Sequence, residues 1–160
     1  MGFGANDKGQ LGVGDCDNKF KPILVMKDLH LRKICCGLNH TLLLRQDGEL
    51  LVFGGNQFGQ LGMGNNSDTH KPVTLMIDDQ IRRIVCGAHH SIIYRRNGEL
   101  FVFGLNQAGQ LGLGMRNNQN KPVLLMKDPR IQQICCGFQH TILYKNNGDL
   151  FVFGDNKYGQ

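Results

Sequence analysis

Short apolar runs separated by turn residues recur along the whole chain. In the middle of the chain three such runs occupy residues 81–87, 91–96 and 99–103, and Asn97-Gly98 separates the second run from the third. Asn-Gly between apolar runs predicts a β-hairpin, because a type I′ turn needs a positive φ at both of its central residues. Asp47-Gly48 and Asn147-Gly148 repeat this signal at intervals of 50 residues. The pattern predicts antiparallel strands.

A fourth apolar run precedes these three in each period. It begins with a Lys-Pro pair, at Lys21-Pro22, Lys71-Pro72 and Lys121-Pro122. Because proline has no N–H to donate to a sheet, we expect it at the first residue of an edge strand. Four short strands in about 50 residues are typical of one β-propeller blade. The expected fold class is therefore all-β, built of four-stranded antiparallel blades.

The last strand of the period is apolar on both faces. Leu100 and Val102 point to one face, whereas Phe101 and Phe103 point to the other. A sheet with one solvated face would alternate polar and apolar residues, so this strand must be covered on both sides. Blades that stack face to face around an axis provide that cover.

A glycine-rich motif follows each such strand, as FGGNQFGQLGMG at residues 53–64 and in related form at 3–14, 103–114 and 153–160. Its glycines supply positive φ angles and allow close backbone approach, and its Asn and Gln side chains can bond unpaired backbone groups in the connection between blades. The residues to which we assign this structural role are Gly54, Asn56, Gly59, Gln60, Gly62, Gly104, Asn106, Gly109, Gln110 and Gly112.

The constant period predicts a single repeat array over residues 1–160. Its units are approximately 1–50, 51–100 and 101–150, with 151–160 entering a fourth, and the second and third units are identical at 26 of 50 positions. Each unit is too small to bury its own apolar face.

Composition adds little to this picture. The formal charge of +5 comes from 18 basic and 13 acidic residues, a mild excess that supports nucleic acid binding only weakly. All the cysteines except Cys16 follow the repeat, and Val85 stands where the other units have Cys35 and Cys135. We therefore interpret the periodic cysteines as small apolar core residues, which indicates a reducing, intracellular setting, cytoplasmic or nuclear. Residues 1–3 show no export signal, and no apolar run has the length of a membrane span.

The sequence indicates no catalytic or cofactor chemistry. His40, His90 and His140 recur beside the periodic cysteine, which suggests either a metal site or a structural histidine, and their periodicity favours ring nitrogens that bond backbone atoms between blades. The glycine motif has Gln60 where a phosphate-binding loop needs Lys. We therefore expect no cofactor, no metal and no enzymatic activity.

These motifs resemble the regulator of chromosome condensation repeat family. The resemblance rests on residues 86–91 (CGAHHS), the Asn97-Gly98 hairpin and residues 103–112 (FGLNQAGQLG), which recur in this order three times. It implies seven-bladed propellers, of which this chain holds about three blades. The founding member is, by resemblance, a nuclear guanine-nucleotide exchange factor for the Ran GTPase that also binds nucleosomes, and many relatives are interaction modules. The constant spacing leaves no room for the projecting hairpin that the exchange factors use.

Three blades leave an apolar face uncovered at each end of the array. Exposing a Phe or Leu that should be buried forfeits about 1.5–3 kcal/mol per side chain. We therefore expect either a piece of a longer propeller or self-association through the uncovered end blades.

The leading functional hypothesis is a protein-protein interaction scaffold. The alternatives are a guanine-nucleotide exchange factor for a Ran-like small GTPase and a chromatin- or DNA-associated adaptor. The candidate interaction residues are those that vary between repeats or carry uneven positive charge, since function on a repeat scaffold lies in its variable surface. They are Asp15, Asp17, Lys19, Asn65, Asp68, His70, Arg116, Asn118, His89, Arg82 and Arg83.

Overall fold

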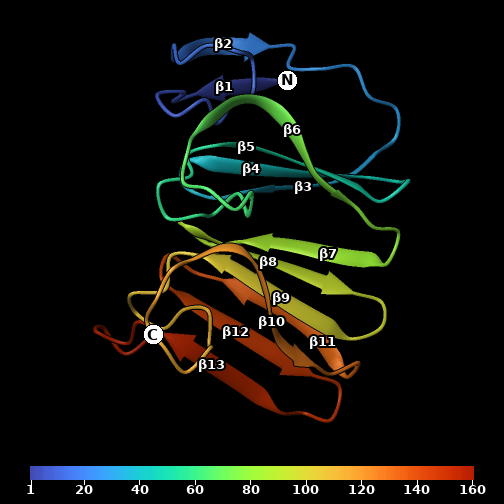
Figure 1. Cartoon of the computed structure of the whole chain (residues 1–160), viewed down its shortest axis with the longest axis vertical. Coiled ribbons are helices and arrows are strands. Elements are labelled where there is room, and N and C mark those ends of the chain that lie inside the picture. Colours follow the sequence, from blue (N-terminus) through green and yellow to red (C-terminus); the bar gives the residue numbers. More distant parts are fainter.

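The computed structural model describes residues 1–160 and contains only strands and turns. The sheets follow one another from the N-terminal to the C-terminal end (Figure 1). The all-β class is confirmed. The thirteen strands are β1 (Gly2–Gly4), β2 (Lys19–Ile23), β3 (Leu31–Cys36), β4 (His40–Arg45), β5 (Glu49–Gly54), β6 (Thr69–Ile77), β7 (Ile81–Cys86), β8 (His90–Arg95), β9 (Glu99–Gly104), β10 (Gln119–Lys127), β11 (Ile131–Cys136), β12 (His140–Lys145) and β13 (Leu150–Gly154).

Two complete blades form the middle of the array. Blade 1 has the strand order β3-β4-β5-β6 and blade 2 the order β7-β8-β9-β10, with every neighbouring pair antiparallel. A three-stranded sheet, β11-β12-β13, forms the incomplete blade 3, and the two-stranded sheet β1-β2 lies at the other end. The predicted partial propeller of four-stranded blades is confirmed.

The Lys-Pro strand belongs to the sheet of the preceding repeat. β6 pairs with β5 and β10 pairs with β9, each at a sheet edge. The predicted edge position is correct, but the prediction that proline begins the strand is wrong, because Pro72 is the fourth residue of β6. The register shifts between Thr69 and Val73, so Pro72 lies in an irregular segment where a missing N–H breaks no regular ladder.

The glycine motif therefore joins two strands of one blade. Its residues 55–64 lie in the connection 55–68 between β5 and β6, which corrects the expectation that the motif connects one blade to the next. The motif still lies at a blade junction, because it packs against the following blade. Gly59 has a φ of +83°, and a Cβ on it would lie 2.4 Å from the Cα of Asn120 in blade 2. Only glycine can adopt this backbone conformation without strain and also fit into the space beside Asn120.

The core lies between the blades, so β5 and β9 are covered on both faces as predicted, whereas Leu150, Phe151 and Val152 of β13 are exposed. Between blades 1 and 2, Leu50 and Val52 of β5 pack with Ile93 and Phe103 of blade 2 in one buried cluster. Between blades 2 and 3, Leu100 and Val102 of β9 join a second cluster. Phe103 thus faces blade 1, whereas Leu100 and Val102 face blade 3, which explains why β9 has no polar face.

Candidate interaction surfaces

The strand register defines two rims of the array. His40 pairs with Gly54, and Gly54 pairs with Thr69, so these strand ends lie at one rim together with the glycine motifs and the turns at 37–39, 87–89 and 137–139. We call this the loop rim. Leu31 pairs with Arg45 at the opposite rim, which carries the hairpins at 46–48, 96–98 and 146–148. We call this the hairpin rim.

The predicted interaction residues do not form one site. Arg82 and Arg83 lie near the start of β7, toward the hairpin rim. The other nine belong to the loop rim: Asp15, Asp17, Lys19, Asn65, Asp68, His70, His89, Arg116 and Asn118.

Several of the loop-rim residues close the glycine motif. The buried Asn56 donates from Nδ2 to the Asn65 carbonyl oxygen at 3.0 Å and accepts the Leu61 N–H at Oδ1 at 2.9 Å. The Asn56 N–H donates to Oδ1 of Asp68 at 2.7 Å, and in the next repeat the Asn106 N–H donates to Oδ1 of Asn118 at 2.9 Å. The side chains of Asp68 and Asn118 are therefore committed to the fold of the loop.

Other members of the set are also held by contacts within the chain. Asp15 accepts from Lys19 Nζ at 2.8 Å, and this hydrogen bond lowers the pKa of the partly exposed Asp15 carboxyl. His70 lies over Gly9 of the preceding loop, where an added Cβ would meet the His70 Cα at 2.6 Å. Asp17 and Arg116 are exposed and make no hydrogen bond or ion pair through their side chains, so they are freely presented.

The periodic histidines link adjacent blades through a hydroxyl group. His40 Nε2 lies 2.9 Å from Ser91 Oγ, and that hydroxyl donates its proton to the Gln60 carbonyl oxygen at 2.8 Å. The hydroxyl therefore accepts from His40, which places the imidazole proton on Nε2. Sequence analysis expected backbone partners, and the direct partner is instead a side chain 51 residues away.

The second blade junction repeats this relay. His90 Nε2 lies 3.1 Å from Thr141 Oγ1, which donates to the Gln110 carbonyl oxygen at 2.9 Å. His140, in blade 3, is only half-buried and makes no such bond. Burial lowers the pKa of His40 to about 3 and of His90 to about 4, since Nδ1 of each ring is buried without a partner that could accept a proton. Both rings are structural and neutral, and nowhere in the chain do three His, Cys, Asp or Glu side chains converge as metal ligands do.

The basic residues toward the hairpin rim are partly engaged across the blades. Arg32 donates to the carbonyl oxygens of Ile81 and Arg82, each at 3.3 Å, and Arg83 donates to the carbonyl oxygen of Gln132. The side chain of Arg82 is exposed and unpaired. Two of these guanidinium groups therefore bridge neighbouring blades, which is more than a solvated strand edge would require.

An aromatic cluster lies on the loop rim and joins three blades. The His89 ring packs edge-on against Phe58, with centroids 5.1 Å apart, and against Phe138, with centroids 6.1 Å apart. We call Phe58, His89 and Phe138 the aromatic cluster. Phe138 is 60% exposed, and partial burial lowers the pKa of His89. Sequence analysis identified only His89.

A signal for the two phenylalanines is present in the sequence. The counterparts of Phe58 are Lys8, Ala108 and Tyr158, and those of Phe138 are Leu38 and Ala88, so the repeat does not require an aromatic ring at either position. Beside the cluster lies an open hollow of about 260 Å³, lined by the three turns 36–38, 86–88 and 136–138. Leu38, 52% exposed, lines it together with Phe138. The result is an exposed apolar surface in the middle of the loop rim.

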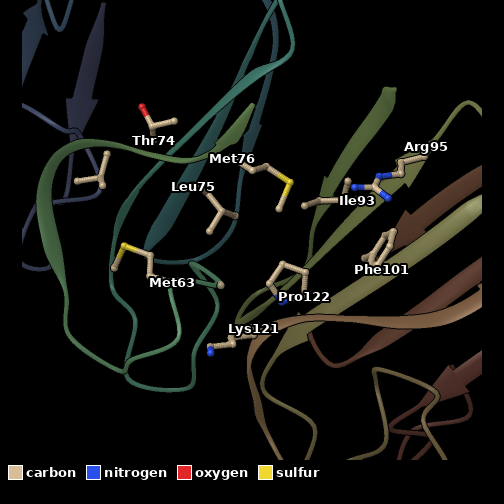
Figure 2. Close-up of a pocket in the computed structure, with 11 residues that line it drawn as sticks. Met63, Thr74, Leu75, Met76, Ile93, Arg95, Phe101, Lys121 and Pro122 are labelled. Atoms are coloured by element: carbon tan, nitrogen blue, oxygen red, sulfur yellow. The ribbon is translucent and has the colours of Figure 1, made fainter. Parts of the chain in front are cut away.

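A larger groove, of about 620 Å³, separates the outer parts of blades 1 and 2. Figure 2 shows Met63 and Met76 of blade 1 facing Phe101 and Pro122 of blade 2. Arg95 lies 4.7 Å above the Phe101 ring, while its N–H groups bond Asp78 and Glu99 at 2.6 and 2.9 Å.

Most lining residues of this groove recur in other repeats. Met126 matches Met76, Lys145 matches Arg95 and Phe151 matches Phe101. Because these residues recur, the stacking of the blades accounts for them. The groove is therefore a weaker candidate for a binding site than the aromatic cluster.

Comparison with known proteins places this geometry in a family. The regulator of chromosome condensation (RCC1) repeat model matches residues 2–44, 47–94 and 97–144, and a second model of the same repeat matches 31–60, 81–110 and 131–160. An RCC1 repeat-containing protein of Schizosaccharomyces pombe is 40% identical over 50 residues, which cover 31% of this chain and 14% of that protein. No helix of the structure has the length and apolar character needed to cross a membrane.

Solved structures show the same fold. Human WBSCR16 superposes with a TM-score of 0.80 at 24% identity over 95% of this chain and 41% of its own. Yeast RCC1 (Prp20), solved bound to Kap60, superposes with a TM-score of 0.83 at 25% identity over 96% of this chain and 39% of its own. The chain thus spans about two fifths of the length of these structures. With three successive repeats matched and the propeller blades superposed, the chain belongs to the family of RCC1 repeat proteins.

Proposed function

We propose that the chain is a protein-protein interaction scaffold that binds a protein partner through the aromatic cluster and the hollow beside it. The observation that carries this proposal is the packing of the half-buried Phe58 and the exposed Phe138 around His89, at positions where the repeat does not require aromatic rings. Packing within the repeat accounts for residues that recur in every unit, whereas Lys8, Ala88 and Ala108 show that the fold does not need aromatic rings at these positions. Exposed apolar patches of this kind mark interaction sites.

The chemistry of the cluster suits a protein partner. Aromatic side chains are enriched at the energetic centres of protein interfaces, where they fill pockets and exclude water. Here the hollow provides the recess, and Leu38 and Phe138 provide apolar walls. An apolar side chain of a partner can enter it while Asp17 and Arg116, on the same rim, remain free for polar contacts at the periphery.

The relatives support a protein partner in general terms. Yeast RCC1 (Prp20) was solved bound to Kap60, and a second structure of Prp20p was described with its binding to Gsp1p and histones. Guanine-nucleotide exchange on a Ran-like small GTPase and adaptor binding to chromatin or DNA are the alternative proposals. The six cysteines are free thiols, which suits an intracellular setting.

A peptide library displayed on phage provides a direct test, with the chain as immobilised target. We expect enrichment of peptides with a large apolar residue, and we expect Phe138→Ser to weaken the selected peptides at least about tenfold, since loss of an interface anchor costs about 2 kcal/mol or more. Met115→Ser is the matched control, because Met115 is 52% exposed on a loop of the same rim outside the cluster. Its affinity, measured by fluorescence anisotropy, should equal that of the unchanged chain.

Equal binding of the selected peptides to the unchanged chain and to Phe138→Ser would refute the proposed site. The alternatives have tests of their own. Accelerated release of fluorescent GDP from a Ran-like GTPase by catalytic amounts of the chain would replace the scaffold proposal with nucleotide exchange. Retention on DNA that weakens steeply with salt would support the adaptor.

A further inference from the structure

Two cysteines face each other where blade 1 meets blade 2. Cys35 lies on β3 and Cys86 on β7, and both pack against the buried cluster between these blades. β3 and β7 lie side by side. At one end Arg32 donates to carbonyl oxygens at the start of β7, and at the other the Leu38 N–H donates to the Ala88 carbonyl oxygen at 3.0 Å. The pair therefore lies inside the array, between its two complete four-stranded blades.

The repeat determines the spacing of this pair. Residues 51 positions apart meet across a blade junction, as the periodic histidines show with their hydroxyl partners. Cys35 and Cys86 have the same separation. At the next junction the corresponding residues are Val85 and Cys136, which pack against the second buried cluster. Of these two junctions, the first alone holds a pair of thiols.

The two thiols are in contact but differ in reactivity. The Cys86 thiol donates a hydrogen bond to the Cys35 sulfur, and this bond lowers the pKa of the Cys35 thiol. Burial raises the pKa of the Cys86 thiol well above its usual range. Because the thiolate is the nucleophilic form of cysteine, Cys35 is the first of the two to react. Cys86 lines the open hollow of about 260 Å³ on the loop rim, which gives a small oxidant access to the pair.

We propose that Cys35 and Cys86 form a reversible disulfide between blades 1 and 2 when hydrogen peroxide oxidises them. The Cys35 sulfur attacks one peroxide oxygen, the O–O bond breaks, and the thiol proton leaves with the other oxygen as water. The Cys86 sulfur then attacks the sulfenic sulfur of Cys35, the S–O bond breaks, and the hydroxyl leaves with the Cys86 proton as a second water. The two thiols lose two electrons, which reduce the peroxide. Exchange with a dithiol reductant restores both thiols.

The disulfide holds together two blades that otherwise meet through non-covalent contacts. It closes a loop of about 50 residues, and a cross-link over such a loop stabilises a fold mainly by restricting the unfolded chain. Disulfides in reducing compartments are usually transient and respond to oxidants. The pair is therefore a modification site by which an oxidant strengthens the junction between blades 1 and 2.

Peptide mapping after mild oxidation tests the proposal with the whole chain. The reduced chain is treated with equimolar hydrogen peroxide at low protein concentration, the remaining thiols are alkylated, and trypsin is added without reductant. We expect a disulfide between the peptides 34–45 and 84–95, at least about tenfold more abundant than any other cysteine link, because these two thiols are in contact before they react. Dithiothreitol should remove the link.

Two variants distinguish Cys35 from Cys36, which lies in the same peptide. Cys35→Val should abolish the link and should remain folded, because Val85 occupies this position in the next repeat. Cys36→Ser is the matched control, since Cys36 is the more exposed of the two thiols, and it should leave the link unchanged. Circular dichroism verifies the fold of each variant. A link that is absent from the unchanged chain, or that survives Cys35→Val, would overturn the proposal.

A third variant supplies the missing thiol at the next junction. Val85→Cys should add a second link, between the peptides 84–95 and 131–145, because Cys136 then has a thiol 51 positions before it, at the separation seen across both blade junctions. Peroxide treatment of this variant without a second link would show that this separation does not bring sulfur atoms together, and would also overturn the proposal.

Discussion

Mild acid should destabilise the array through the two buried histidines. Burial lowers the pKa of His40 to about 3 and of His90 to about 4, whereas the unfolded chain titrates near 6.5. Because the folded pKa values are depressed, the unfolded chain binds more protons at every pH between these limits. The stability contribution of each neutral ring is complete above pH 6.5 and is lost as the pH falls below it.

The magnitude follows from the proton linkage. At pH 5 a histidine with an unfolded pKa of 6.5 is almost fully protonated in the unfolded chain and almost fully neutral in the folded one. The difference amounts to about 2 kcal/mol per ring, or about 4 kcal/mol for the pair, between pH 7 and pH 5. The physical cause is that a second ring proton, on Nδ1, would be buried without an acceptor.

Urea denaturation at half-unit steps between pH 7 and pH 5 measures this loss. The carboxyl groups with lowered pKa values, Asp28 and Glu99 among them, act mainly below this window, because their unperturbed pKa values are 3.8 and 4.5. The double variant His40→Gln/His90→Gln should be less stable at pH 7 and should keep only the smaller pH dependence that the lowered pKa of His89 contributes, whereas the exposed His30→Gln should keep the full dependence. An unfolding free energy of the unchanged chain that is flat from pH 7 to pH 5 would refute the assignment of buried, neutral rings.

Two further predictions concern the glycine motif. Gly59→Val should lower the free energy of unfolding by about 3 kcal/mol or more, since it adds a clash with Asn120 to the strain of a positive φ. Gly109 has a φ of +79° but open space around it, so Gly109→Val should lower the free energy of unfolding by the strain alone, about 1–2 kcal/mol. Equal losses in urea denaturation would mean that the motif does not pack on the following blade. Asn56→Ala should cost about 2–3 kcal/mol by leaving the buried Leu61 N–H unpaired, and the exposed neighbour Gln57→Ala less than about 0.5 kcal/mol. A thermal unfolding midpoint that is the same for both variants would contradict that role.

Local patterns in the sequence were sufficient to predict the strands of a blade. The Asn97-Gly98 turn brings 91–96 and 99–103 together, and the observed strands β8 and β9 agree with these ranges within one residue. The reason is that a two-residue turn and the alternation of side chains are determined by neighbours in the chain. The same holds for the two-sided burial of β9, because no polar face exists on it to meet water.

Local sequence patterns could not predict which strand pairs with the Lys-Pro strand. Sequence analysis assigned Lys71-Pro72 to the strands that follow, whereas β6 pairs with β5, which precedes it across the glycine motif. An edge strand carries similar residues whichever sheet it joins, so its pairing depends on the closure of the intervening loop. The closure is achieved by Asn56 and Asp68, whose hydrogen bonds are visible only in three dimensions.

The candidate interaction surface was likewise predicted only in part from the sequence. The sequence by itself determined the fold class, the period, the strands and the residues that vary, because each depends on a pattern within one repeat. Only the tertiary structure decided that Asp68 and Asn118 serve the loop, that His40 meets a hydroxyl of the next blade, and that Phe58, His89 and Phe138 come together. The hydrogen bonds of Asp68 and Asn118 close one loop over 12 residues. The contacts of His40 and of the aromatic cluster join different blades, so their distances depend on how the blades stack rather than on any local preference.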